Sequence, residues 1–169
     1  MTQEEKFLLL KHLCGSLPYV TYVRIVEADC LEKSESITEG CVGGYSNTRM
    51  CQDYSMDEIF EFIESGDTVK PYLRPLGSMT EEEERELSKK YVWDINCGQI
   101  EIRYHSEGYW DDNIECPTSE YLNLFDWLNA HHFDYRGLIP MGLAIEAPEG
   151  MYKFGEMSNF VEHFIDLTE

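Results

Sequence analysis

The chain has 169 residues, the usual size of one domain, and 43% of them are hydrophobic, which is enough for a packed core. It carries 33 acidic and 13 basic residues, and its net charge is −20. Direct binding to nucleic acid or to an anionic membrane surface is therefore disfavoured, because both need a basic footprint. We expect one globular domain over residues 1–169.

The sequence contains no stretch of about 18 apolar residues, and its start lacks the basic segment and cleavage site of a secretion signal. We therefore expect a cytoplasmic protein. None of the six cysteines belongs to a CxxC or CxxH pair, so we expect reduced, mostly buried thiols instead of disulfides or a zinc site. These cysteines are Cys14, Cys30, Cys41, Cys51, Cys97 and Cys116.

The N-terminal residues have the pattern of an α-helix. Thr2 and Glu5 have the spacing of a capping box, in which each side chain bonds the main-chain N–H of the other residue. Pro18 is expected to end this helix. The residues expected on its buried side are Phe7, Leu10, Leu13, Cys14 and Leu17.

Two strands and a second helix are expected next. The segment from Tyr19 to Ala28 is rich in β-branched and aromatic residues at both alternating sets of positions, which is typical of a central strand. The segment from Ser36 to Tyr45 is expected to pair with it as a hairpin. Ser55 and Glu58 then repeat the capping-box spacing, and Gly66 has the position of a helix stop. The apolar stripe of this helix is expected to be Met56, Ile59, Phe60 and Ile63.

Two prolines predict an extended connection over Lys70–Ser78. This segment concentrates positive charge on an acidic chain, and it suggests two interpretations. Lys70 and Arg74 would bind a partner's carboxylates with Tyr72 as an aromatic anchor. Alternatively, the segment covers the sheet, with Leu73 buried and its charges paired with nearby glutamates.

The remaining elements complete an α+β pattern. We expect helices at Thr80–Lys90, at Ser119–His131 and near Ser158–Leu167, and a half-buried strand at Gln99–Tyr104. Helices and strands do not alternate regularly along the chain, which disfavours a doubly wound sheet. The predicted architecture is a single domain with a small, mostly antiparallel sheet and about four to five helices.

One cluster of polar residues stands out near the end of the fourth expected helix. His131, His132, Asp134, Tyr135 and Arg136 are the residue types that bind an anionic or planar ligand. The alternative is a structural corner, in which His132 extends the apolar stripe of the helix and Asp134 pairs with Arg136. A metal site is disfavoured, because adjacent residues on a helix point about 100° apart.

Three stretches resemble a known family when they are taken together. They are LLLKHLCGSLPYV (residues 8–20), VKPYLRPLGSMTEEEE (residues 69–84) and FDWLNAHHFDYRGLIPMGLAIEAPEGMYK (residues 125–153). The chain resembles small proteins of unassigned function from gut Bacteroidetes and their phages and mobile elements. The resemblance implies an accessory protein in an intracellular setting, and it implies no activity, cofactor or catalytic residue. It does not extend to Asp29–Asp67.

The sequence contains no GxSxG, HExxH, P-loop or GxGxxG motif, so we expect no catalytic residue, no cofactor and no metal. The charge favours a binding module that engages a protein with a basic surface, such as a nucleic-acid-binding or defence protein. The alternatives are a small-ligand binder or enzyme centred on His131–Arg136, and a purely structural role.

Overall fold

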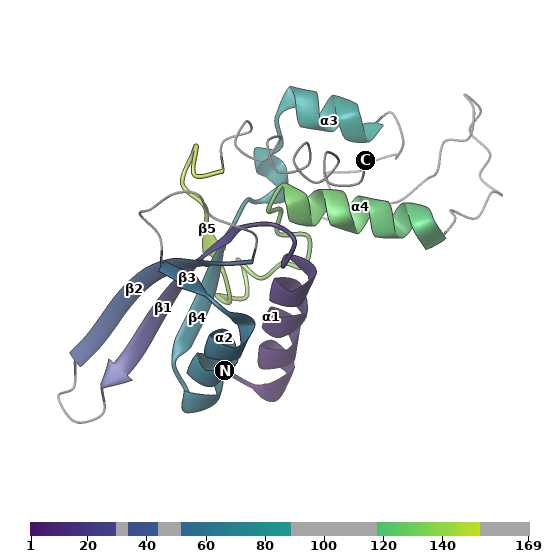
Figure 1. The fold of residues 1–169 in the computed structure, drawn as a ribbon. Coiled ribbons are helices and arrows are strands. Elements are labelled where there is room, and N and C mark those ends of the chain that lie inside the picture. Colours follow the sequence, from purple (N-terminus) through teal and green to yellow (C-terminus); the bar gives the residue numbers. More distant parts are fainter. Residues whose placement is uncertain (30–33, 44–51, 89–117, 153–169) are drawn as a thin grey trace, which may run out of the picture.

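The computed structural model describes residues 1–29, 34–43, 52–88 and 118–152 (Figure 1). The strand expected at Gln99–Tyr104 and the helix expected near Ser158–Leu167 lie outside these residues. The described helices are α1 (Gln3–Gly15), α2 (Met56–Ser65), α3 (Glu81–Ser88) and α4 (Thr118–Ala130), with a short 3-10 helix, η1 (Leu76–Ser78). The described strands are β1 (Thr21–Asp29), β2 (Ser34–Val42), β3 (Gln52–Tyr54), β4 (Thr68–Leu73) and β5 (Ile145–Glu146).

The strands form one sheet in the order β3-β2-β1-β4-β5, so β1 is the central strand, as its composition predicts. β1 pairs antiparallel with β2 in the expected hairpin, and antiparallel with β4 on its other side. The predicted α+β class is confirmed. The sheet, however, is mixed and not mostly antiparallel, because β3 and β5 add to its two edges as parallel strands. Both are too short, at three and two residues, to show a pattern in the sequence.

The expected connection at Lys70–Ser78 is partly a strand. In an antiparallel ladder, pairs that exchange main-chain hydrogen bonds alternate with pairs that do not. The N–H of Tyr22 and the C=O of Tyr72 both point into the space between β1 and β4, where the Tyr152 hydroxyl binds both. The neighbouring pair, Val23 and Pro71, is therefore one that exchanges no bond, so the missing N–H of Pro71 costs the ladder nothing.

Local signals predict where the N-terminal helices begin and end. The capping boxes of Thr2 with Glu5 and of Ser55 with Glu58 are both present. Gly66 ends α2 in the left-handed conformation, with φ of 97°. α1 ends at Gly15, before Pro18.

The buried faces of these two helices differ from the prediction. α1 buries Leu9, His12 and Leu13, and Leu10 packs against the same core, whereas Phe7 is 69% exposed. The prediction was right for Leu10 and Leu13. It was wrong for Phe7, Cys14 and Leu17, which are exposed, because α1 has apolar residues on several sides and its periodicity does not identify one face. In α2, Phe60 is exposed, and Phe62 instead packs edge-on against Tyr54 at a ring distance of 5.7 Å.

Three clusters of buried apolar side chains hold the described elements together. The helices α1 and α2 cover one face of the sheet (Figure 1), and each fully buried aliphatic side chain there contributes about 1.5–3 kcal/mol. This first cluster consists of Leu9, Leu13, Val23, Ile25, Val42, Tyr54, Ile59, Ile63 and Val69. The second joins α3 and α4 and consists of Met79, Leu87, Leu124, Leu128 and Phe133. The third lies around β4 and consists of Leu73, Leu138, Leu143 and Ala144.

Within the described ranges, no helix is both long enough and apolar enough to cross a bilayer. Two of the six cysteines lie in these ranges, and neither forms a disulfide. Cys14 is exposed and Cys41 is buried.

Candidate functional site

The structure brings the two candidate clusters of the sequence together. The end of β4 bonds to the residues that follow α4, because the N–H of Arg74 donates to the carbonyl of His132 at 2.8 Å. In return, the N–H of Asp134 donates to the carbonyl of Arg74 at 2.8 Å. We call residues 131–136 the corner. The corner and β4 therefore form one region.

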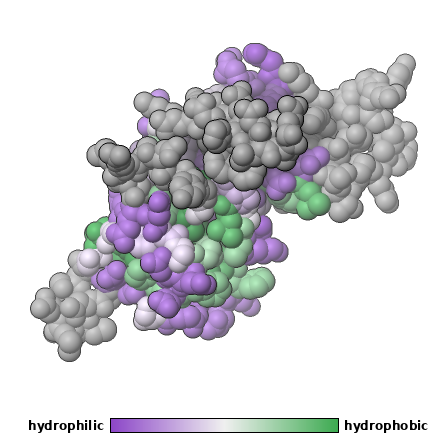
Figure 2. All heavy atoms as spheres, in the orientation of Figure 1, coloured by the Kyte–Doolittle hydropathy of each residue, from purple (hydrophilic) through white to green (hydrophobic). Residues whose placement is uncertain are grey.

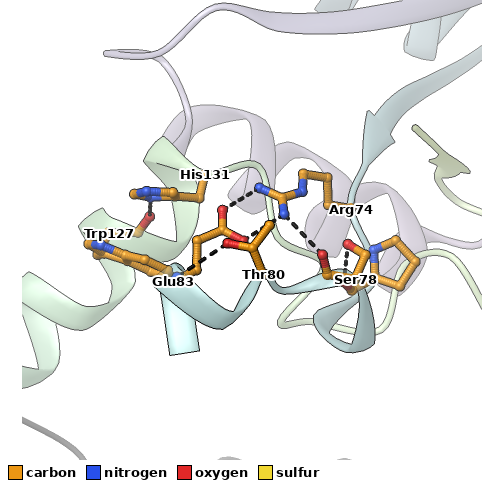
Figure 3. A network of polar contacts seen from close by, with 7 residues as sticks. Arg74, Ser78, Thr80, Glu83, Trp127 and His131 are labelled. Carbon is orange, nitrogen blue, oxygen red and sulfur yellow. Dashed lines mark hydrogen bonds and ion pairs between the residues drawn. The ribbon is translucent and has the colours of Figure 1, made fainter. Parts of the chain in front are cut away.

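Arg74 is the most highly connected of the predicted site residues (Figure 3). Its guanidinium donates to both carboxylate oxygens of Glu83, at 2.7 and 2.8 Å, and to the carbonyl of Ser78 at 3.2 Å. The same group lies 4.3 Å from the ring centroid of Phe133. These contacts join β4, α3 and the corner.

Glu83 is at the same time the capping residue of α3. The N–H of Thr80 donates to its carboxylate at 2.7 Å, and its own N–H donates to the Thr80 hydroxyl at 3.3 Å. Burial raises the pKa of Glu83, but the hydrogen bonds from Arg74 and Thr80 outweigh it, so the net pKa is lowered. Glu83 is therefore a buried, charged side chain inside a run of four glutamates, of which the other three are exposed.

His131 directly follows the last residue of α4. Its ring stacks on Trp127 at 3.8 Å, and its Nδ1 is 2.8 Å from the Trp127 carbonyl, to which it donates. Burial lowers the pKa of His131, while the bond to Trp127 and the carboxylates of Glu83 and Glu86 act in the opposite direction. This histidine is neutral at physiological pH and half-buried.

His132 lies just past α4 and adopts the left-handed backbone conformation, with φ of 58°. Its side chain is buried, as predicted, and its ring stacks on Tyr152 at 3.6 Å. Nδ1 has no hydrogen-bond partner among the described residues. Burial lowers the pKa of His132 to about 3, with smaller effects in the same direction from His131, Arg74 and His12.

Asp134 is not the partner of Arg136, which corrects the pairing considered for a structural corner. Its two carboxylate oxygens accept hydrogen bonds from the N–H groups of Leu138 and Ile139, both at 2.8 Å. Arg136 instead lies over the ring of Tyr135, with its guanidinium carbon 4.8 Å from the centroid. Asp134 therefore closes the turn that follows the corner.

Tyr135 packs between elements and does not extend into solvent. Its hydroxyl donates to Oδ1 of Asn129 at 3.0 Å, and its ring lies 5.3 Å from that of Phe125. The buried ring of His12 from α1 lies 5.8 Å from Tyr135 on the same region of the fold.

Lys70 and Tyr72 lie on β4, in the sheet. The Tyr72 hydroxyl donates to the Glu39 carboxylate at 2.6 Å, and Glu39 also forms an ion pair with Arg24 at 2.8 Å. Lys70 is half-buried and lies opposite Arg24 in the ladder. Leu73 is buried and Arg74 pairs with Glu83, as the second interpretation expects. The segment does not cover the sheet, however, because its residues up to Leu73 form a strand of it.

Two residues of this region were missed in the sequence. His12 is 1% exposed, and neither ring nitrogen has a hydrogen-bond partner in the described part of the chain. Burial, with a smaller effect of Arg136, lowers the pKa of His12 to about 4. Its spacing of three from Leu9 was a usable signal, although a histidine is an unexpected member of an apolar stripe. Tyr152, which bridges β1 and β4, had no local signal at all.

The region contains the buried, neutral imidazoles of His12 and His132, and it contains Arg74, whose charge is paired with that of Glu83. Among the residues that the structure describes, no three histidine, cysteine or acidic side chains converge as metal ligands. The fold defines an α+β domain with a mixed five-stranded sheet and a corner that joins β4 to α3 and α4. Comparison with protein-family models, curated proteins and solved structures finds no match to this chain.

Proposed function

We propose that this protein is a non-catalytic, acidic binding module that acts in the cytoplasm and engages a basic surface of another protein. The observation that supports this most is the distribution of charge on α2 and α3. Together these helices carry eight exposed carboxylates, and Arg85 is their one basic side chain. The carboxylates are Asp57, Glu58, Glu61 and Glu64 on α2, and Glu81, Glu82, Glu84 and Glu86 on α3.

Pairing within the chain leaves most of this imbalance in place. Glu64 of the eight carboxylates lies 3.6 Å from Lys6, whereas Arg24 and Arg74 pair with Glu39 and Glu83, which are not among the eight. Figure 2 shows hydrophilic residues interspersed with hydrophobic ones over the part of the surface where α1 and α2 lie. Phe60 is exposed among the carboxylates of α2 and offers an apolar contact to a partner.

A surface of this kind attracts a cationic partner over long distances and speeds its association. A host nucleic-acid-binding or defence protein presents a suitable basic surface, since that surface evolved to bind phosphates. The resemblance to proteins of phages and mobile elements supports an accessory role of this type, including inhibition of such a host protein.

The test compares two triple variants at exposed positions of α3. Glu81, Glu82 and Glu84 are replaced together by glutamine, which removes charge, or by aspartate, which retains it. Each protein is immobilised and incubated with host lysate at low and physiological salt, and captured proteins are identified by mass spectrometry. We expect one protein to bind the wild type and the aspartate variant but not the glutamine variant. Capture that is equal for all three proteins and at both salts would contradict the proposal.

One observation favours the alternative of a small-ligand binder or enzyme at the corner. The ring nitrogens of His12 and Nδ1 of His132 are buried without a partner within the described ranges, and such atoms usually bond to water or a ligand. Thermal unfolding with added phosphate, acetate and nucleoside probes tests this alternative. A saturable rise in Tm that His12→Leu abolishes would favour it.

A further inference from the structure

A short segment after β5 crosses back over the sheet. We call residues 147–152 the strap. At its start, the N–H of Ala147 donates to the carbonyl of Leu73 at 2.8 Å, next to the parallel pairing of β4 with β5. A turn follows, in which the N–H of Met151 donates to the carbonyl of Pro148 at 3.1 Å. The strap ends at Tyr152.

Tyr152 joins β1 and β4 at the point where their direct pairing stops. The last directly paired residues there are Val23 and Pro71. One position further on, the Tyr152 hydroxyl accepts a hydrogen bond from the N–H of Tyr22 at 3.1 Å and donates to the carbonyl of Tyr72 at 2.8 Å. Its ring also packs against that of Tyr22 at 5.5 Å. The strap thus occupies main-chain groups of both strands.

His132 covers the other side of this tyrosine. The two rings are nearly parallel, at 17°, with centroids 3.6 Å apart. The charged and titratable groups that act on His132 are Arg74 from β4, His131 from the corner and His12 from α1, and all of them disfavour its protonation. The carboxylate of Asp134, two positions along the chain, accepts hydrogen bonds from the N–H groups of Leu138 and Ile139. A proton on His132 would therefore be buried near the positive charge of Arg74, and Nδ1 has no acceptor among the described residues.

We propose that His132 and Tyr152 form an acid-sensitive latch, which holds the strap across β1 and β4 while His132 is neutral and releases it in acid. In the closed state His132 is buried and stays unprotonated. In the open state its ring reaches water and accepts a proton, so acid stabilises the open state. Opening frees the N–H of Tyr22 and the carbonyl of Tyr72, and it changes the surface of the sheet without unfolding α1 and α2.

The size of the effect follows from proton linkage. The pKa of His132 is about 3 in the closed state and near its ordinary value of 6.5 when the ring is exposed. Lowering the pH from 7.5 to 5.0 should therefore raise the ratio of open to closed molecules about 30-fold.

The experiment is amide hydrogen exchange of the full chain, followed by NMR at pH 7.5 and pH 5.0 and corrected for intrinsic exchange rates. The reporters are the amides of Ala147 and Tyr22, which the strap protects, and the internal reference is Ile59 in α2. We expect the protection of both reporters to fall about 30-fold while Ile59 stays protected. The latch would be contradicted if the protection of the Ala147 and Tyr22 amides did not change with pH, or if the protection of Ile59 fell by the same factor.

Three variants show which residue causes the pH dependence of the exchange. His132→Phe keeps a flat ring on Tyr152 and cannot be protonated, so its reporters should lose their pH dependence, whereas His12→Phe should retain it. Tyr152→Ala leaves His132 in place but removes its stacking partner. In this variant, the amide of Ala147 should exchange at pH 7.5 as fast as it does in the wild type at pH 5.0. If His132→Phe does not fold, the exchange rate of the Ala147 amide in Tyr152→Ala tests the proposal by itself. A Tyr152→Ala variant with wild-type protection at neutral pH, or pH dependence abolished only by His12→Phe, would refute the proposal.

Discussion

The guanidinium of Arg74 donates to both carboxylate oxygens of Glu83, at 2.7 and 2.8 Å, and so ties the end of β4 to the first turn of α3. Both side chains are largely buried, with exposed fractions of 15% and 5%. Arg74 also lies over Phe133 and bonds through its main chain to the corner. Arg74 therefore joins the end of β4 to α3, nine positions further on, and to the corner, which is distant from both in the sequence.

Glu83→Gln should lower the free energy of unfolding by about 2–4 kcal/mol, because it leaves Arg74 without its charged partner. Glu84→Gln is the matched control on the exposed side of α3 and should change stability by less than about 0.5 kcal/mol. Because the pKa of Glu83 is lowered in the folded state, its contribution is complete above pH 4.5 and is lost below it. Urea unfolding of both variants at pH 7 and pH 4 measures these differences.

Asp134→Ala should destabilise the protein by about 1.5–3 kcal/mol, because it removes a charged acceptor from two main-chain N–H groups. Arg136→Ala should cost less than about 1 kcal/mol, since Arg136 only lies over Tyr135. Denaturant unfolding of the two variants compares them directly. Equal losses would mean that Asp134 depends on Arg136 after all.

His132→Ala should lower the free energy of unfolding by about 1–3 kcal/mol through the lost stack on Tyr152. His132→Gly loses the same contact but relieves the left-handed backbone, where φ is 58°. It should therefore be about 1 kcal/mol more stable than His132→Ala. Thermal and urea unfolding of the pair test this order, and the opposite order would show that the backbone at this position is not strained.

His12→Leu should leave stability at pH 7 unchanged or slightly higher. It replaces two ring nitrogens that have no partner in the described part of the chain by an apolar side chain of similar size. The folded pKa of His12 is about 4 and its ordinary value is 6.5, so the unfolded chain takes up the proton first. Stability is lost as the pH falls from 6.5 toward 4, by about 3 kcal/mol from this residue. The variant should lack that part of the acid destabilisation in urea unfolding at pH 7 and pH 5. A loss above about 1 kcal/mol at pH 7 would instead indicate a bound water or ligand at His12.

Replacing Glu81, Glu82 and Glu84 by glutamine should slow association with the basic partner about tenfold and change dissociation little. Glu83 is left intact because it holds Arg74. The difference between variant and wild type should shrink at physiological salt, since exposed charges are screened over about 10 Å at 0.1 M. Stopped-flow or surface-plasmon measurements of the captured partner test this, with unfolding curves as the control for stability.

Short-range signals account for what could be predicted of the fold. The capping residues Thr2 and Ser55 lie three positions from their glutamates, so the pairs are visible in the sequence. The same holds for Thr80 and Glu83, and the β1–β2 hairpin also joins neighbouring segments. The burial of Leu73 and the pairing of Arg74 with a glutamate were among the stated alternatives for their segment.

The candidate site could be predicted only in part. The corner residues were identified, and the burial of His132 was expected under the structural alternative, in which it extends the apolar stripe of the helix. The prediction that Asp134 pairs with Arg136 was wrong. The Asp134 carboxylate instead accepts hydrogen bonds from main-chain N–H groups, which no sequence pattern distinguishes from those of other residues. The buried face of α1 was predicted correctly only at Leu10 and Leu13, because apolar residues occupy several sides of this helix.

By itself, the sequence determined the charge, the α+β class, the central strand and the helix starts, because each depends on composition or on residues a few positions apart. The tertiary structure decided the parallel edge strands, the burial of His12 and the joining of β4 to the corner. It also decided the contact of Tyr152 with Tyr22, across 130 positions of the chain. Such contacts depend on which surfaces meet when the sheet and helices pack, and packing selects among many partners that are chemically equivalent in the sequence.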